Sequence, residues 1–488
     1  MIDVLMTHSY FLRFDRKQWN LSQPYAPLGT LYASSVLREA GFKIALFDPM
    51  LAESESDLER YIVHYTPGIV AIYDDSFNYL TKMCLERMRI AAFRMMRIAR
   101  RHGCQVIVSS SDSADHAGEY LEQGADYVII GEGEYTLLDL TKKIVRGEGG
   151  GNSGIRGISY LERGKVIFTG PRSPTSTPDA IPFPAWDLVD VDSYKQLWSK
   201  SGFFSMNVVT TRGCPYGCNW CAKPIYGRVY NSRSPANVVM ELAMLGKMFN
   251  PDHIWFCDDI FGLKRGWLAE FAAEVQRAGL NIRYKCLSRP DLLIRENSFD
   301  LLAKSGCETV WIGAESGSQK ILDAMEKGTN VEQIKLATRQ LRGRGIRVGY
   351  FLQFGYPGES YEDIRMTLSM LKEEMPDEIG VSVSYPLPNT EFHQMVKDAI
   401  GKRTNWFDSD DLRMLFPGEY KPVFYKLLHR AIHKMHRLRR ISGRMEKWGF
   451  RTAAVFVFNI FTLPFYLAAM QLNRSRNPAR VSIKVRQP

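Results

Sequence analysis

The sequence is poor in cysteine, with eight in 488 residues, which excludes a disulfide-dense secreted scaffold. With 45% hydrophobic and 24% charged residues, the composition also excludes a disordered or collagen-like chain. The first residues, MIDVLMTHSY, lack the basic stretch that precedes the apolar run of a signal peptide, so we interpret them as a first strand. No solenoid-type repeat is visible. A chain of this length is expected to form about two or three domains.

Acidic residues are almost absent from the C-terminal end. Between Lys421 and Arg451 there are ten Lys or Arg and one acid, and between Leu472 and Pro488 there are five and none. The net charge of +10 therefore comes from a tail of +14, and residues 1–420 are slightly acidic at −4. The basic character, and any partner that recognises it, belongs to one end of the chain.

Residues 1–148 alternate between strand and helix patterns. An apolar run of strand length lies at residues 2–6, and further strand patterns lie at residues 43–50, 68–76, 105–111 and 126–134. Helical stretches separate them, among them one that ends near Gly41 and a long one over residues 79–102. This alternation predicts an N-terminal α/β domain with a Rossmann-like parallel sheet, whose ligands would bind at the carboxyl ends of the strands.

Residues 149–202 are expected to connect two domains. Glycines dominate residues 147–154, a hairpin pattern follows with Arg163-Gly164 at its turn, and five prolines mark an extended strap over residues 171–186. From residue 203 to 395, six further strand patterns alternate with helices. They predict a partial (β/α)6 barrel of the TIM type, followed by a helical C-terminal region over residues 396–488.

Three cysteines crowd into the segment TTRGCPYGCNWCAKP, as Cys214, Cys218 and Cys221 with C-x3-C-x2-C spacing. Three thiolates on a Gly- and Pro-containing loop can hold an iron–sulfur cluster and leave one iron open to a small chelating molecule. Trp220 places a ring where a planar ligand can lie. A zinc knuckle that borrows a distant histidine, or chance clustering, are the alternatives. Structural zinc normally takes four ligands, and no second CxxC pair is present.

This motif resembles that of the radical S-adenosylmethionine (SAM) superfamily, and the resemblance continues through the six strand patterns up to residue 395. The order and spacing are similar to the subgroup that joins the barrel to an N-terminal cobalamin-binding domain. That subgroup includes methylases and the anaerobic magnesium-protoporphyrin ester cyclase. The resemblance implies a [4Fe–4S] cluster on the three cysteines, with SAM chelated to the open iron. One electron would then cleave SAM to a 5′-deoxyadenosyl radical inside a barrel that excludes water.

The resemblance also places contacts to SAM near the ends of the strands, on Trp220, Asp259, Glu315, Ser316, Gly355 and Tyr385. The carboxylates would bind the methionine amine or the ribose hydroxyls, and the serine would add a second ribose contact. The glycine would allow close approach of the adenine, with the tyrosine on the same wall. Structural alternatives are that Asp258 and Asp259 are turn residues and that Glu315 pairs with Arg289.

Residues 1–148 resemble the cobalamin-binding domains of this subgroup, with Gly131-Glu132-Gly133-Glu134 as a good match. Two departures stand against it. Ser109-Ser110-Ser111-Asp112 occupies the place of a common Gly-Gly-Pro-His stretch, and no cobalt-ligating Asp-x-His-x-x-Gly motif is present. We interpret His116 as a surface loop residue. Cobalamin is therefore predicted from architecture. The alternative is a Rossmann-like domain that only packs on the barrel or shapes the substrate cavity.

The tail over residues 421–473 combines basic and apolar character. Its first part places apolar residues on a single helical stripe, at Phe424, Leu427, Leu428, Ala431, Met435 and Leu438. Residues 452–473 carry no charge and are long enough to cross about 30 Å of hydrocarbon, although Asn459 and Pro464 weaken that reading. We expect attachment to a membrane surface, with soluble packing on the barrel and true crossing as alternatives. Nucleic acid is not expected, because no recognised nucleic-acid module is present.

The sequence thus predicts a cytoplasmic radical SAM enzyme, peripheral on the inner face of the membrane. Methylation of an unactivated carbon through cobalamin is the leading hypothesis for the reaction. The substrate would be a small molecule, lipid or isoprenoid-like if the tail binds membrane, and the electron donor a flavodoxin or ferredoxin. The alternatives are a cyclase-like oxidation or rearrangement without methyl transfer, and a zinc-stabilised, membrane-associated scaffold without catalysis. A methylthiotransferase of tRNA is disfavoured, because Cys84 and Cys104 alone do not supply the ligands of a second cluster.

Overall fold

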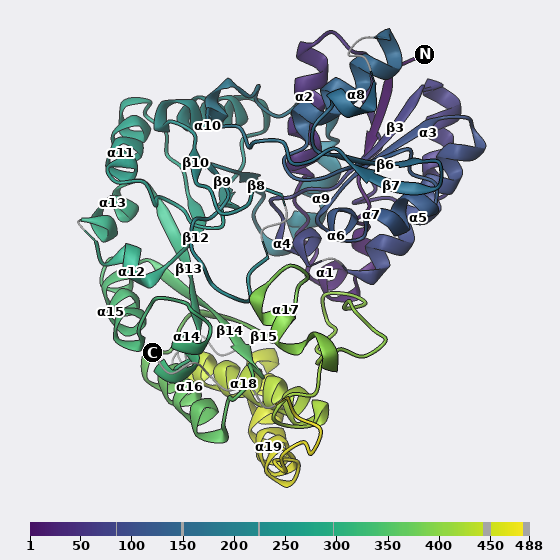
Figure 1. Ribbon diagram of the computed structural model, residues 1–488. Helices are drawn as coiled ribbons and strands as arrows, with labels where there is room; N and C mark the ends of the chain where they lie inside the picture. Colours follow the sequence, from purple (N-terminus) through teal and green to yellow (C-terminus); the bar gives the residue numbers. More distant parts are fainter. Residues whose placement is uncertain (84, 148–150, 223–224, 296, 443–449, 482–488) are drawn as a thin grey trace. The chain divides into compact units, whose positions relative to one another are not determined.

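The computed structural model describes residues 1–83, 85–147, 151–222, 225–295, 297–442 and 450–481 (Figure 1). The chain divides into two compact units. The first comprises Met1–Tyr216, Lys223–Tyr284 and Asn405–Asp411, and the second Gly217–Ala222, Lys285–Thr404 and Leu412–Pro488. The expected domain limits at residues 148, 202 and 395 stay predictions, and the first of them lies outside the described residues.

The first unit contains a seven-stranded sheet with the order β2-β1-β3-β4-β5-β6-β7 (Figure 1). Its parallel part is formed by β1 (Val4–Thr7), β2 (Ile44–Leu46), β3 (Ile69–Tyr73), β4 (Gln105–Ser109) and β5 (Tyr127–Ile129). Every residue of β1 and β3 is buried, as expected for parallel strands that are covered on both faces. The predicted Rossmann-like parallel sheet is confirmed.

Helices α1 to α8 connect these strands or follow them, as α1 (Arg16–Leu21), α2 (Leu28–Glu39), α3 (Asp57–Tyr65), α4 (Tyr79–Lys82), α5 (Glu86–Arg101), α6 (Ser111–Asp115), α7 (Ala117–Glu122) and α8 (Glu134–Arg146). The single long helix expected over residues 79–102 is wrong. Leu85 is extended and precedes α5, and the Thr81 hydroxyl donates to the Asn78 carbonyl oxygen 2.7 Å away. The chain therefore leaves the helical path between α4 and α5.

The connecting segment adds two antiparallel strands to the same sheet. The predicted hairpin is confirmed as β6 (Ile158–Glu162) and β7 (Lys165–Phe168), and β6 pairs with β5. Its turn residues Arg163 and Gly164 both have positive φ, 50° and 75°, which suits a two-residue hairpin loop. The proline-rich strap contains two short 3-10 helices (Pro178–Ala180 and Trp186–Leu188) and leads into α9 (Val191–Trp198).

The six further predicted strands form a half-barrel sheet in the order β15-β14-β13-β12-β11-β8. They are β8 (Ser205–Val208), β11 (His253–Phe256), β12 (Tyr284–Ser288), β13 (Cys307–Glu315), β14 (Arg347–Phe354) and β15 (Glu378–Val383). Strands β8 and β11 pair in parallel in the first unit, and β13, β14 and β15 do so in the second. The short antiparallel pair β9 (Thr211–Arg212) and β10 (Asn231–Ser232) was not predicted, because two residues give no readable period.

Helices alternate with these strands, as α10 (Pro235–Phe249), α11 (Trp267–Arg277), α12 (Pro290–Leu293), α13 (Ser298–Lys304), α14 (Gln319–Ala324), α15 (Val331–Arg342) and α16 (Tyr361–Glu374). The second unit continues with α17 (Glu391–Val396), α18 (Pro422–Ser442) and α19 (Phe450–Leu472). Helix α18 contacts both β15 and α19. One segment, Thr452–Leu472, is long and apolar enough to cross a membrane, with a mean hydropathy of 1.9, and 11% of its most apolar stretch is buried.

Candidate active site

In the first unit, β8 and then β9 lead along the chain into the cysteine segment. Cys214 is buried, and it follows Gly213, whose φ is 83°. A side chain at Gly213 would collide with the Val229 carbonyl oxygen. Glycine is therefore required here by both backbone conformation and space.

Asp258 and Asp259 follow β11 and have different surroundings. Asp258 is buried and accepts hydrogen bonds from the backbone amides of Thr210 and Thr211, each at 2.7 Å, and from both threonine hydroxyls. Burial raises the pKa of Asp258 to about 6, although these hydrogen bonds oppose the rise. Asp258 thus fixes the connection between β8 and β9 through its side chain. Asp259 is more exposed and pairs with Lys82, with Nζ and Oδ1 2.7 Å apart.

Arg212 lies directly before the cysteine segment and binds two carboxylates of the N-terminal sheet. Its guanidinium forms an ion pair with Glu132 and lies 2.8 Å from Glu134 Oε1. It also stands over the rings of Tyr32 and Tyr226, 5.3 and 5.4 Å from their centroids. Burial raises the pKa of Glu132, Glu134 adds to the rise, and Arg212 opposes it. The Gly131–Glu134 segment thus has an observed role as a buried anchor for β9.

In the second unit, Asn219 holds the segment that carries Cys218 and Cys221. Its side-chain amide donates to the Ala324 carbonyl oxygen at 2.8 Å and accepts from the Tyr356 hydroxyl at 3.2 Å. Its backbone amide donates to the Met325 carbonyl oxygen at 3.2 Å, and its carbonyl accepts from the Phe392 amide at 3.0 Å. Four hydrogen bonds on one residue fix this segment against α14 and α17. Sequence reasoning missed Asn219, since an asparagine between two cysteines has no distinctive pattern.

Glu315 ends β13 with a left-handed backbone, φ 57°, beside a bulge between Gly313 and Glu315. The carboxylate is buried and accepts from Lys327 Nζ at 2.9 Å, so the alternative pairing with Arg289 is wrong. Burial alone would lower the pKa of Lys327, but the Glu315 carboxylate and the Cys218 sulfur raise it above its ordinary value. A side chain at Gly313 would lie 2.7 Å from Lys327 Nζ, so the small residue makes room for this ion pair.

Arg289 is also buried and reaches the same cysteine. Its NH1 lies 4.0 Å from Cys218 Sγ, its Nε donates to Asp291 at 2.9 Å, and its NH2 donates to the Lys327 carbonyl oxygen at 2.8 Å. Two buried cations therefore surround Cys218. They complement the negative charge of a metal-bound thiolate. No sequence pattern pointed to Lys327, and Arg289 was expected only as an alternative partner for Glu315.

Trp220 lies beside this cationic group. Lys327 Nζ stands 5.8 Å from the centroid of its ring. The indole Nε1 is buried and finds no hydrogen-bond acceptor in the described part of the chain. A buried donor without a partner costs free energy, and a bound ligand with an acceptor would remove that cost. Across residues 1–481, outside the gaps given above, no three His, Cys, Asp or Glu side chains converge on a site for a single metal ion.

The other residues expected at SAM are partly engaged within the second unit. The Ser316 hydroxyl lies 3.2 Å from the Thr367 hydroxyl and accepts from the Ser318 amide at 3.1 Å. Gly355 has φ 82°, and a side chain there would lie 2.9 Å from Met414 Cε, so packing explains this glycine. Tyr385 is buried just beyond β15. Their contacts with SAM stay predictions.

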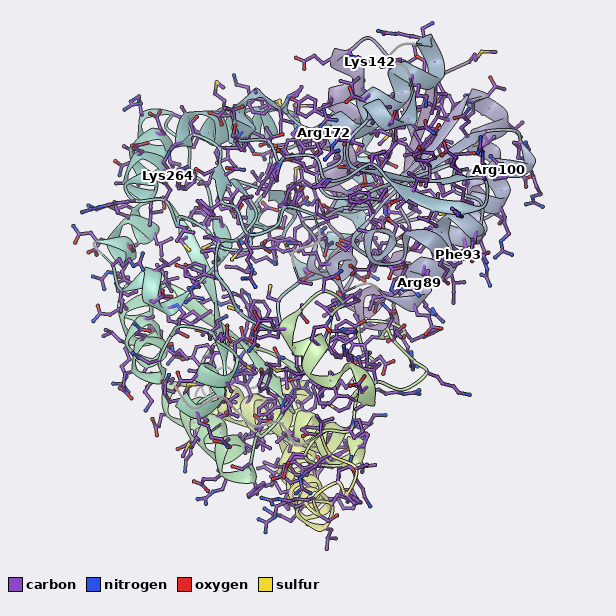
Figure 2. All side chains as sticks on the ribbon, viewed as in Figure 1. Arg89, Phe93, Arg100, Lys142, Arg172 and Lys264 are labelled. Carbon is purple, nitrogen blue, oxygen red and sulfur yellow. The ribbon has the colours of Figure 1, made fainter. Side chains whose placement is uncertain are left out.

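At the carboxyl edge of the N-terminal sheet, the buried segment Ser109–Asp112 runs from the end of β4 into the first residues of α6. Ser110 and Ser113 cap each other's backbone amides there. Arg89 on α5, labelled in Figure 2, binds the Asp112 carboxylate in a bidentate way. Its Nε donates to Oδ2 and its NH2 to Oδ1, each at 2.6 Å. His116 lies between α6 and α7 and is half-buried, and its interpretation as a surface loop residue stays a prediction.

One acceptor at this edge is left without a donor. Asp75, directly after β3, uses Oδ1 for the amides of Gly29 and Phe77, each at 3.0 Å. Its Oδ2 is buried and has no hydrogen-bond partner among the described residues. Burial raises the pKa of Asp75, and the two amides oppose the rise. An unsatisfied buried carboxylate at the ligand-binding edge of a parallel sheet suits a ligand that donates hydrogen bonds.

Comparisons with known proteins agree with this architecture. Residues 208–371 match the family described as Radical SAM superfamily. An uncharacterized methyltransferase of Pyrococcus horikoshii is 28% identical over 371 residues, which cover 75% of this chain and 77% of that protein. The anaerobic magnesium-protoporphyrin IX monomethyl ester cyclase of Rubrivivax gelatinosus is 27% identical over 300 residues, or 60% of this chain. The match covers 52% of the cyclase, so this chain spans about half of that relative.

The fold is also similar to a solved structure. The cobalamin-dependent SAM radical enzyme OxsB, with aqua-cobalamin bound, superposes with a TM-score of 0.75. The superposition covers 96% of this chain and 72% of OxsB at 17% identity, which shows a shared fold. Residues 208–371 of this chain are thus similar to the Radical SAM superfamily, within a fold that the chain shares with OxsB.

Proposed function

We propose that the enzyme holds a [4Fe–4S] cluster on Cys214, Cys218 and Cys221, binds SAM, and methylates an unactivated carbon with the help of cobalamin. The observation that carries this proposal is the C-x3-C-x2-C segment within the matched radical SAM region. The bound cluster supplies the electron that cleaves SAM.

The residues near the cysteines fit such a cluster. Cys214 and Cys218 are buried, Gly213 provides the tight turn, and Arg289 and Lys327 bring positive charge to Cys218. In this proposal Glu315 binds the SAM amine or ribose. Lys327 then holds the Glu315 carboxylate in position. Asp259, Ser316, Gly355, Tyr385 and Trp220 are proposed as further SAM contacts.

Cobalamin is proposed at the carboxyl edge of the N-terminal sheet. The unpaired Asp75 Oδ2 supports it, because the corrin periphery carries carboxamides that donate hydrogen bonds. The names of relatives support methyl transfer, since the Pyrococcus protein is called a methyltransferase and OxsB a cobalamin-dependent enzyme. The chain's own contribution is to orient the bound molecules and exclude water from a reactive radical.

Anaerobic reconstitution of the full chain tests the cluster. We expect a brown protein that cleaves SAM under a strong reductant, and a Cys218→Ala variant that is colourless and inactive. Cys104→Ala, which removes another buried thiol outside the motif, should retain both properties. A colourless wild-type protein that contains zinc would instead support the scaffold alternative.

A cyclase-like oxidation or rearrangement is the second candidate, because the Rubrivivax cyclase is among the relatives. The products separate the two reactions. With cobalamin added, the methylase proposal expects S-adenosylhomocysteine as well as 5′-deoxyadenosine, and the cyclase reading expects 5′-deoxyadenosine alone. A titration with cobalamin, compared between wild type and Asp75→Leu, tests whether the sheet edge binds the corrin.

We propose a small-molecule substrate, lipid or isoprenoid-like in class, and a flavodoxin or ferredoxin as the electron donor. The location proposed is the cytoplasmic face of a membrane, where both reduced electron carriers and lipid substrates are available. The apolar helix α19 supports this location.

A further inference from the structure

Helix α19 turns its apolar side outward. Phe458, Phe461 and Phe465 expose 61%, 77% and 69% of their surface, while the polar Asn459 is fully buried. Val455, Val457, Ile460, Leu467 and Leu472 extend the exposed apolar face. A helix of a soluble protein normally places its apolar stripe toward the core. An apolar face of this length on a protein surface marks a site of interaction.

The contacts of α18 explain why α19 is oriented this way. Lys434 Nζ donates to Thr462 Oγ1 at 2.8 Å and lies 3.4 Å from Asn459 Oδ1. The same ammonium stands over the Phe458 and Tyr466 rings, 4.5 and 5.2 Å from their centroids. Asn459 and Thr462 of α19 are thus engaged between the two helices. Turning the phenylalanines inward would separate Lys434 from these partners.

The neighbouring helix α18 presents positive charge. Lys426, Arg430, Arg437 and Arg440 are exposed, at intervals of four, seven and three residues, which places them along one side of the helix. From Lys421 to the end of the sequence the only acidic residue is Glu446. An apolar helix face next to a row of cations is typical of segments that bind anionic lipid surfaces.

The helix pair is tied to the second unit at several points. His436 Nε2 donates to the Pro376 carbonyl oxygen at 2.7 Å, and Arg439 donates to that of Lys372 at 3.0 Å. After α19 the chain returns to the segment before α18, where the Asn477 amide donates to the Glu419 carbonyl oxygen at 2.8 Å. A helix that crossed about 30 Å of hydrocarbon would break these contacts. The contacts favour α19 parallel to the membrane plane.

We infer that α19 lies in the plane of an anionic membrane, with its exposed phenylalanines among the lipid chains and the cations of α18 on the headgroups. This inference rests on the membrane location proposed above, and adds the charge of the lipid surface and the way in which α19 binds it. A second copy of the chain is a weaker occupant of the face, because two basic α18 helices would be brought together and would repel each other.

Vesicle flotation with the full chain tests the inference, using phosphatidylcholine vesicles with and without phosphatidylglycerol. Phe461→Gln/Phe465→Gln should lower binding to both vesicles by at least about 100-fold, because two buried aromatic groups are lost. Arg437→Gln/Arg440→Gln should lower binding to the anionic vesicles by about 30-fold and change little on neutral ones. The matched control Leu336→Gln/Met366→Gln removes apolar residues that are 46% and 44% exposed on α15 and α16, and should bind as wild type.

Two results would overturn the inference: wild type that does not float with anionic vesicles, or a phenylalanine variant that floats as well as wild type. A wild-type dimer that the phenylalanine variant dissociates would assign the face to a second copy. A C-terminal epitope protected from protease added to the vesicles would indicate a crossing helix. SAM cleavage without vesicles should be equal in all variants, so failure of membrane binding remains separate from failure of the proposed chemistry.

Discussion

Glu315 and Lys327 form a buried ion pair in which each residue depends on the other. Their side chains are 6% and 9% exposed, and the Glu315 backbone is left-handed. Lys327→Met would leave the carboxylate buried without its counter-charge, and should lower the free energy of unfolding by about 3–5 kcal/mol. The double variant Lys327→Met/Glu315→Gln should recover most of this loss. Chemical denaturation of the apoprotein measures both.

An exposed ion pair provides the control. Arg365 and Glu362 lie 3.0 Å apart on α16 with side chains 64% and 59% exposed, so Arg365→Met should change stability little. If Lys327→Met were as mild as this control, the buried ion pair would contribute little to stability. That result would contradict the role of Lys327 in positioning Glu315.

Glu359 makes the free energy of unfolding depend on pH. Burial raises its pKa from 4.5 to about 8, and the Gly355 amide, which donates to Oε2 at 2.6 Å, opposes the rise. The unfolded carboxyl loses its proton near pH 4.5 and the folded one near pH 8, so stability falls as the pH rises between these values. Glu359→Gln should remove this slope of about 1.4 kcal/mol per pH unit.

Denaturation midpoints at pH 6, 7 and 8 measure the effect. The advantage of Glu359→Gln over wild type should grow with pH by up to about 3 kcal/mol across this interval. Glu362→Gln changes an exposed carboxyl on the neighbouring helix and should run parallel to wild type. Parallel curves for wild type and Glu359→Gln would mean that Glu359 is ionised throughout.

At the scale of elements, the segment Gly217–Ala222 depends on Asn219 for its attachment to α14 and α17. Asn219→Ala removes the side-chain bonds to Ala324 and Tyr356 and leaves a buried carbonyl oxygen with one partner fewer, at a cost of about 1–3 kcal/mol. We expect faster alkylation of Cys218 and Cys221 in the apoprotein and poorer cluster assembly. Mass spectrometry of the alkylated protein gives the rates for each cysteine.

Asn330→Ala is the control that distinguishes release of the cysteine segment from a general loss of stability. Asn330 caps α15 through its side chain and the Gln333 amide, so its loss should cost a similar free energy of about 1 kcal/mol. Alkylation of Cys218 and Cys221 should remain at the wild-type rate. If alkylation of Cys218 and Cys221 were accelerated equally in both variants, Asn219 would have no specific role in fixing the cysteine segment.

At the scale of the whole molecule, Arg212 joins the N-terminal sheet to the strand that precedes Cys214, within the first unit. Arg212→Met would leave Glu132 and Glu134 buried side by side without a counter-charge, so we expect a loss of about 3–5 kcal/mol. The triple variant Arg212→Met/Glu132→Gln/Glu134→Gln should regain most of it. Limited proteolysis at neutral pH measures how readily the unit opens. If the triple variant is cleaved as fast as the single one, the charge argument fails and the loss is due to packing of Arg212 on Tyr32 and Tyr226.

The sequence by itself determined the parallel sheet, the six barrel strands and the cysteine segment. Short, largely apolar segments separated by helical periods leave few alternatives to parallel α/β layers. The C-x3-C-x2-C spacing is local, so it can be read without coordinates. The same holds for the uncharged stretch over residues 452–473, whose length and composition do not depend on its neighbours.

Only the tertiary structure decided which charged groups meet. Lys327 pairs with Glu315 from 12 positions away, Arg289 reaches Cys218 from 71 positions away, and Arg212 reaches Glu132 from 80 positions away. No local periodicity encodes such pairs, because they form where separate loops meet at strand ends. The direction of α19 is likewise tertiary. The composition determines that α19 is apolar. The hydrogen bonds from Lys434 to Asn459 and Thr462 determine which side of α19 is exposed.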